Sequence, residues 1–218
     1  MTPEAFVADL DRTNREALDR LGAAATAGEP GPGLTVALLL KLALKNEIEA
    51  SEIAALWMGR SPEIDVKLAL ARQAGDEAKH YRLIEERLAA LGVPPGSVDP
   101  LAEGYTPLFQ YLAGLETTVE RVAAGQFTRE SLALIRNQAF IDYCESQGDA
   151  ETARLYREVI QPDEEHHHEL GRKLLLRYAD GPEQQEAARR AAAGTLRLAE
   201  EIQEMARLRR GISRAPGC

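Results

Sequence analysis

The chain is poor in the residues that build sheets and disulfide frameworks. Aromatic side chains make up only 5% of its 218 residues, and β-branched residues are few beside the many Ala, Leu and Glu residues. This balance favours helices over strands. The only cysteines, Cys144 and Cys218, do not form a disulfide framework. We therefore expect reduced thiols, with Cys144 in the core, and a cytoplasmic protein.

Long apolar runs are also lacking. The most apolar stretch, residues 34–44, is interrupted by Lys41 and is too short to span a bilayer. The first ten residues include Glu4 and Asp9 and have no apolar core, so we expect neither a signal peptide nor a membrane partner. A net charge of −9 disfavours nucleic acid as a partner. The mildly basic stretch from Glu183 onward does not exclude it.

Helical periodicity runs through nearly all of the sequence, and Gly and Pro residues divide it into segments. We predict an all-α fold in a single domain, residues 1–218. Two helix hairpins with short turns would form an antiparallel four-helix bundle at about residues 34–178. Additional helices are expected at residues 3–25 and 182–210.

The boundaries of the core helices follow from capping signals. Ser61–Pro62 and Thr106–Pro107 each predict an N-cap followed by proline in the first turn. Gly125 is a candidate break in the third core helix, and Gly148–Asp149 separates the third from the fourth. The loop at residues 28–33 ends the first helix of the chain. The predicted core helices therefore cover about residues 34–58, 61–91, 106–147 and 149–179.

The second and fourth core helices carry the same short motif, Asp-Glu-x-x-His. Residues three apart lie on one face of a helix, so each motif directs a carboxylate and an imidazole to the same place. Both motifs fall on otherwise apolar stripes, where charged groups are costly to bury unless they are paired or bound to metal. Two such motifs indicate a dinuclear metal site. The two motifs are Asp76, Glu77 and His80, and Asp163, Glu164 and His167.

The fourth core helix offers a second register, in which Glu165 and His168 would be the ligands. That register shares its face with Gln161 and Arg172, which indicates a solvated surface. We therefore assign Glu164 and His167 as ligands. The remaining side chains of this stretch, Glu165, His166 and His168, are interpreted as flanking or surface residues.

The first core helix should supply one more carboxylate. Glu47 shares a stripe with apolar residues and lies twelve residues before Gly59, while Glu77 lies sixteen after Ser61. At about 1.5 Å of rise per residue, Glu47 and Glu77 reach similar heights in their hairpin. Glu49 is the second choice, because its face of the helix is also apolar.

The third core helix should supply the last carboxylate. Glu164 lies fifteen residues after Asp149, so its partner should lie about fifteen before the turn, and Glu130 fits. Glu116 would lie about 20 Å further along the axis. Glu116 and Glu120 stay as alternatives in case this helix is broken.

These residues resemble the ligands of the ferritin-like carboxylate-bridged di-iron superfamily. The order is Glu47, Glu77-x-x-His80, Glu130 and Glu164-x-x-His167. Its spacing is most similar to the hydroxylases of bacterial multicomponent monooxygenases and to the small subunit of ribonucleotide reductase. The stretch from Gly148 to Gly171 also resembles small uncharacterised ferritin-like proteins. The resemblance covers about residues 34–178 and is limited to motifs.

The resemblance implies two bound Fe ions, or Mn, that activate O₂ to oxidise or hydroxylate a small-molecule substrate. It also implies that Asp76 and Asp163 orient the metal-bound histidines. A reductase or ferredoxin would donate electrons, and a homodimer is compatible with this reading. Ferroxidase, iron-handling or peroxide-reducing activity is the alternative, and a scaffold whose buried acids and histidines merely pair is a third. The sequence identifies neither a catalytic residue beyond the ligands nor the substrate.

Four further residues have a structural and a functional reading. Pro162 lies inside the fourth core helix, where it removes a backbone hydrogen bond and should kink the helix. Tyr156 falls on the core stripe, where it would pack or donate a hydrogen bond. Asn137 and Gln126 either line a cavity or satisfy backbone groups of the third core helix.

Overall fold

The computed structural model describes residues 1–26, 33–212 and 215–217, and all regular elements in these ranges are helices. The all-α prediction is therefore confirmed. The loop predicted at residues 28–33 lies almost wholly outside the described residues, as does Cys218. The elements are α1 (Pro3–Thr26), α2 (Val36–Arg60), α3 (Ile64–Ala90), α4 (Pro107–Ala113), α5 (Thr118–Val122), η1 (Ala123–Arg129), α6 (Glu130–Ser146), α7 (Ala150–Leu155), η2 (Tyr156–Ile160), α8 (Gln161–Tyr178) and α9 (Pro182–Arg210).

The link between α2 and α3 corrects one prediction. Ser61 does not begin α3. It ends α2, because its backbone N–H donates to the Trp57 carbonyl at 2.9 Å, while α3 begins after Glu63 without a side-chain cap. Proline disfavours helical geometry in the residue before it. Ser61 is accordingly extended (ψ 132°), and Pro62 lies in the turn rather than in the first turn of α3.

The third core segment is interrupted earlier than predicted. Thr106 caps α4 as expected, accepting from the Phe109 N–H at 3.1 Å. The break, however, falls at residues 114–117, where Thr117 and Glu120 form a new capping box for α5. At Gly125 the chain stays helical but widens into the π-helix η1, and the Glu130 N–H donates to the Gly125 carbonyl.

The fourth core segment begins as predicted and contains a second π-helix. Gly148 has φ 76°, and the Asp149 side chain accepts from the Thr152 N–H at 3.0 Å to cap α7. The π-helix η2 directly precedes Gln161 and Pro162. Proline lacks an N–H and its ring crowds the carbonyl four residues earlier, so a widened turn relieves both problems at this point.

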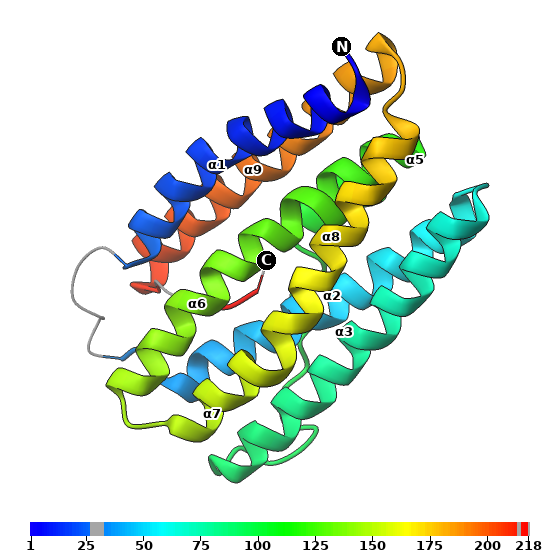
Figure 1. Cartoon of the computed structure of the whole chain (residues 1–218). Coiled ribbons are helices and arrows are strands. Elements are labelled where there is room, and N and C mark those ends of the chain that lie inside the picture. The colour runs from blue at the N-terminus through cyan, green and yellow to red at the C-terminus, as the bar shows by residue number, and fades with distance from the viewer. Residues whose placement is uncertain (27–32, 213–214, 218) are drawn as a thin grey trace.

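Helices α2, α3, α6 and α8 lie alongside one another, and α1 pairs with α9 beyond α6 (Figure 1). Three apolar clusters lie among the described residues, and the third, which includes Leu21 and Leu132, packs α1 against α6. The first includes Trp57, Leu70 and Phe127, and the second includes Ile84 and Phe140. Cys144 is buried in the second cluster as a free thiol, as predicted. No helix in the described part of the chain is long and apolar enough to cross a membrane.

Residues 215–217 lie between α2 and α6 (Figure 1). Ile212 packs into the second apolar cluster. Asn46 of α2 donates through Nδ2 to the Pro216 carbonyl at 2.8 Å, and the Gly217 N–H donates to Oδ1 of Asn137 of α6 at 2.8 Å. We call residues 215–217 the C-terminal strap. It links two helices through residues distant in sequence.

Candidate metal centre

The structure brings all six predicted ligands together in the interior. Each of these residues is at most 3% exposed. They form two overlapping groups in which one ligand atom per residue lies within 4.8 Å of the others, and Glu77 and Glu164 belong to both groups. Such a group of buried carboxylates and imidazoles could hold a metal ion. The first group is Glu47, Glu77, His80 and Glu164, and the second is Glu77, Glu130, Glu164 and His167.

Helix geometry accounts for the short contacts within each motif. His80 Nδ1 lies 3.2 Å from Glu77 Oε2 and 3.4 Å from Glu47 Oε2. His167 Nδ1 lies 3.5 Å from Glu164 Oε2. The spacing of three residues places the acid and imidazole of each motif on one helix face. The α2–α3 hairpin then brings Glu47 to the height of His80, as the residue count predicted.

The alternative carboxylates have other partners. Glu49 accepts hydrogen bonds from the Thr106 N–H at 2.8 Å and the Thr106 hydroxyl at 2.5 Å, so it holds the start of α4. Glu120 completes the capping box of α5. Glu116 is exposed. None of these three belongs to either group of potential ligands found among the described residues.

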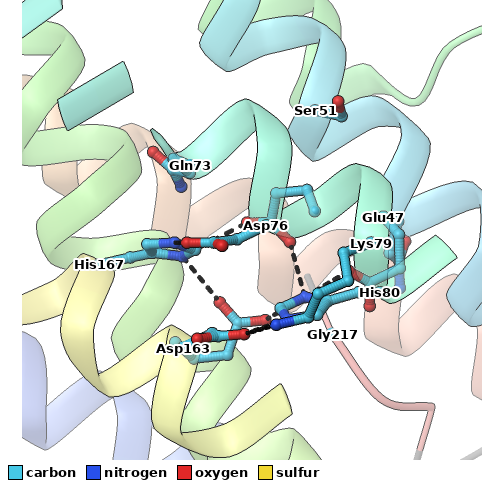
Figure 2. Close-up of polar contacts among 12 residues, drawn as sticks. Glu47, Ser51, Gln73, Asp76, Lys79, His80, Asp163, His167 and Gly217 are labelled. Atoms are coloured by element: carbon cyan, nitrogen blue, oxygen red, sulfur yellow. Dashed lines mark hydrogen bonds and ion pairs between the residues drawn. The ribbon is translucent and has the colours of Figure 1, made fainter. Parts of the chain in front are cut away.

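Asp76 and Asp163 each contact a histidine on the opposite helix. His80 Nε2 lies 3.0 Å from Asp163 Oδ2, and His167 Nε2 lies 3.1 Å from Asp76 Oδ2 (Figure 2). An aspartate beside Nε2 favours the neutral imidazole tautomer that is protonated on Nε2, and in this tautomer Nδ1 has the free electron pair that can bind a metal. In both histidines Nδ1 is the atom that faces the glutamates of the cluster.

A basic residue contacts each of these aspartates on its outer side. Lys79 Nζ lies 2.6 Å from Asp163 Oδ2, and Arg72 Nε lies 3.3 Å from Asp76 Oδ2. Burial opposes ionisation of Asp163, but hydrogen bonds from Lys79 and His80 outweigh it and lower the pKa of Asp163. Asp163 therefore stays charged and keeps its hydrogen bond to His80 over a wide pH range.

The cluster itself is crowded with like charges. Burial, with the neighbouring Glu77, raises the pKa of Glu47 to about 7, and burial raises the pKa of Glu164 well above its ordinary value. Burial also opposes ionisation of Glu77, but the two histidines outweigh it and lower its pKa to about 2. For His80, burial is outweighed by Glu47 and Glu77, which raise its pKa to about 11. Without another cation the cluster must retain protons to be stable.

Three atoms at the centre of the cluster have no hydrogen-bond partner among the described residues. They are Glu77 Oε1, Glu164 Oε2 and His167 Nδ1. Buried polar atoms are nearly always satisfied, and leaving them unpaired is costly. Because these three atoms are ordinary metal-ligand types, a bound cation would satisfy them together. The donor set of carboxylate oxygens and imidazole nitrogens suits Fe, Mn or Zn.

Two neighbours of Glu130 were missed by the sequence analysis. Gln73 Nε2 donates to Glu130 Oε1 at 2.6 Å, and Arg129 Nη1 lies 3.5 Å from the same atom. Gln73 precedes Glu77 by four residues, so helical periodicity alone places it one turn from the cluster. Arg129 carried no such signal, because its direction depends on the π-helix η1.

His168 flanks the site, as expected, and is half-buried. Its Nδ1 lies 2.8 Å from the Phe127 carbonyl and 2.9 Å from the Ser131 hydroxyl, and its ring stacks on the Phe127 ring. Burial lowers the pKa of His168. The face that we expected to be solvated is half-buried at His168, where η1 packs against α8, and exposed at Glu165. His168 therefore holds α8 to η1 from outside the cluster.

Three other buried polar residues differ in how they are satisfied. Asn137 Oδ1 accepts a hydrogen bond from the backbone N–H of Gly217 in the strap, but Asn137 Nδ2 has no hydrogen-bond partner among the described residues. The Tyr156 hydroxyl is likewise buried and unpaired there, while its ring packs edge-on against Phe140 at 4.8 Å. Neither amide atom of Gln126 has a hydrogen-bond partner in that part of the chain.

Comparisons with protein-family models, with curated proteins and with solved structures found no match for this chain. The functional proposal therefore depends on the residues and the geometry of the cluster.

Proposed function

We propose that the cluster binds two metal ions, iron in the first instance, and uses them to activate O₂. The observation that carries this proposal is the sharing of Glu77 and Glu164 between two ligand groups. One ion would be held by Glu47 and His80 and the other by Glu130 and His167. The two shared glutamates would then bridge the ions. A single ion would leave ligands of the other group unsatisfied.

The arrangement of the ligand-bearing helices supports a ferritin-like four-helix bundle. In that fold, two helices give one Glu each, and the other two give a Glu-x-x-His motif each. Here α2 and α6 carry the single glutamates, and α3 and α8 carry the motifs. Helices α1 and α9 would be additions to that bundle, packed on the side of α6.

The reaction that we propose is the oxidation or hydroxylation of a small substrate by a non-haem di-iron oxygenase or oxidase. Bound iron would supply the electrons that reduce O₂. The protein contributes a buried site that excludes bulk water, and Asp76 and Asp163 hold the histidines in position. An external reductase or ferredoxin would return the electrons after each turnover.

Anaerobic titration with Fe²⁺, followed by rapid mixing with O₂, tests this function. We expect two Fe per chain by elemental analysis and a transient absorbance change when O₂ is added. A protein that stays colourless and binds no stoichiometric amount of iron would contradict the proposal. Size-exclusion chromatography of the iron-loaded protein separates the alternative, since assembly into a large cage that accumulates iron would indicate iron storage instead.

A further inference from the structure

The amide of Gln126 is unsatisfied in a part of the interior next to the cluster. Its side chain is 1% exposed, and neither Nε2 nor Oε1 has a hydrogen-bond partner among the described residues. A primary amide offers two donor hydrogens and an acceptor oxygen. Burying such a group without partners is costly, so the site calls for a bound molecule that supplies them.

The π-helix η1 places Gln126 one turn from a ligand. Gln126 precedes Glu130 by four residues, and the Glu130 N–H donates to Gly125, five residues back. The wider turn of a π-helix keeps residues four to five apart on nearly the same face. Gln126 therefore shares the inward face on which Glu130 reaches the cluster.

Gly171 of α8 fixes the position of Gln126 from the other side. A Cβ atom at Gly171 would lie 2.7 Å from the Gln126 carbonyl carbon and 2.9 Å from Gln126 Cβ. Gly171 follows His167 by four residues, one helical turn. The side chain of Gln126 thus begins where η1 contacts α8, one turn along the chain from Glu130 and close to the turn of α8 that follows His167.

The surroundings of Gln126 combine a second amide with apolar groups. Gln73 of α3, which donates to Glu130, lies one turn from Glu77 on the same side of the cluster. The neighbours of Gln126 along η1, Ala124 and Phe127, belong to the first apolar cluster, which also includes Trp57. A molecule bound at Gln126 would therefore meet a polar group at one end and apolar side chains at the other.

We propose that Gln126 binds the substrate of this site, and that the substrate carries a neutral amide on an apolar body. An amide supplies an acceptor for Nε2 and a donor for Oε1 at the same time, which satisfies both unpaired atoms of Gln126. A carboxylate supplies no donor, and the four glutamates of the cluster disfavour a further anion. The reaction at the amide-bearing molecule rests on the proposed function, whereas its binding does not.

Three small probes of similar shape test the proposal: butyramide, pentan-2-one and butyrate. Binding is followed by the side-chain NH₂ signals in ¹H–¹⁵N spectra of metal-free and zinc-loaded protein, and Gln126 is assigned by the loss of its signals in Gln126→Leu. We expect butyramide to shift the Gln126 signals saturably and to bind at least about tenfold more tightly than the other two probes. The exposed Gln138, which donates to Asp142, should not respond.

The variants supply the decisive comparison. Gln126→Leu should abolish the preference for butyramide over pentan-2-one, and Gln126→Met, which keeps the length of the side chain, should do the same if the leucine variant misfolds. Equal affinities of the wild-type protein for all three probes would overturn the proposal. Gln126 signals that ignore butyramide would overturn it as well, and would point to a buried water.

Metal content measured on the same samples separates this proposal from the proposed function. Selective binding of butyramide to a protein that takes up no iron would support the amide-binding site and contradict the proposed oxygen activation. Stoichiometric iron binding without a response at Gln126 would do the reverse.

Discussion

Two glutamates in α2, two positions apart, show how finely the site depends on single residues. Glu47 lies in the cluster, whereas Glu49 holds the start of α4 through Thr106. We expect Glu47→Ala to lower the iron bound from two ions per chain to one or none. The matched variant Glu49→Ala should keep both ions but reduce the free energy of unfolding by about 1–3 kcal/mol, the usual cost of lost hydrogen bonds to a charged group. Elemental analysis and urea unfolding of both variants check this pair of outcomes.

The aspartates behind the histidines should control metal affinity rather than stoichiometry. Asp163→Asn removes the charge that orients His80, and loss of such an outer contact typically weakens metal binding by about 10- to 100-fold. The change is measured by competition with a chelator of known affinity. Asp142→Asn, which alters an exposed aspartate that accepts a hydrogen bond from Gln138 on α6, is the control and should have no effect. Equal affinities in the two variants would contradict the orienting role of Asp163.

Metal binding should release protons. The pKa of His80 is about 11 in the metal-free cluster, so its imidazole is protonated at neutral pH, and a metal binds only the neutral form. Burial also raises the pKa of Glu164 well above its ordinary value and that of Glu47 to about 7, so these glutamates add protons to be displaced, the one on Glu47 below about pH 7. Apparent affinity should thus rise with pH, by up to about tenfold per unit for each proton, and more steeply below pH 7. Calorimetry in buffers with different protonation enthalpies counts the protons, and an affinity independent of pH would contradict the prediction.

At the scale of the elements, periodicity predicted what depends on local spacing. The Glu-x-x-His motifs follow from the helical period and the choice of Glu130 from counting residues back from the turn before Asp149, and the structure brings these residues together. The break at residues 114–117 was missed although the Thr117 and Glu120 capping box is a local signal, whereas the two π-helices depend on contacts between helices. Gly125 illustrates this, since it looks like a helix breaker in the sequence but allows Trp57 of α2 to approach.

The close approach at Gly125 yields a stability prediction. A Cβ atom there would lie 2.5 Å from Cζ3 of Trp57, whose ring is part of the buried core. Gly125→Ala should therefore lower the free energy of unfolding by about 1–3 kcal/mol through overpacking. Gly75→Ala is the matched control, because that exposed helical glycine has nothing within 4 Å of its added Cβ. It should raise stability by up to about 1 kcal/mol. Chemical denaturation of both variants measures the decrease expected for Gly125→Ala and the increase expected for Gly75→Ala in the free energy of unfolding.

At the scale of the whole molecule, the C-terminal strap joins helices that are far apart in the sequence. Truncation after Gly211 removes Ile212 from the core and leaves the side chains of Asn46 and Asn137 without the strap. We expect a loss of about 2–4 kcal/mol in the free energy of unfolding, from one buried apolar side chain and two hydrogen bonds. Thermal and urea unfolding measure the loss, and an unchanged midpoint would show that the strap contributes nothing to stability.

The position of the strap also sets an order of events during synthesis. A ribosome makes a chain from its N-terminus at about 5–20 residues per second, so all four ligand-bearing helices emerge before residues 215–217 do. Asn46 is next to Glu47, and Asn137 lies two turns beyond Glu130, so the strap joins the two helices from which these two glutamates come. The growing chain therefore has an interval in which its ligands can fold together while these two helices are not yet joined. Metal entry before the strap closes would need no later opening of the mature protein.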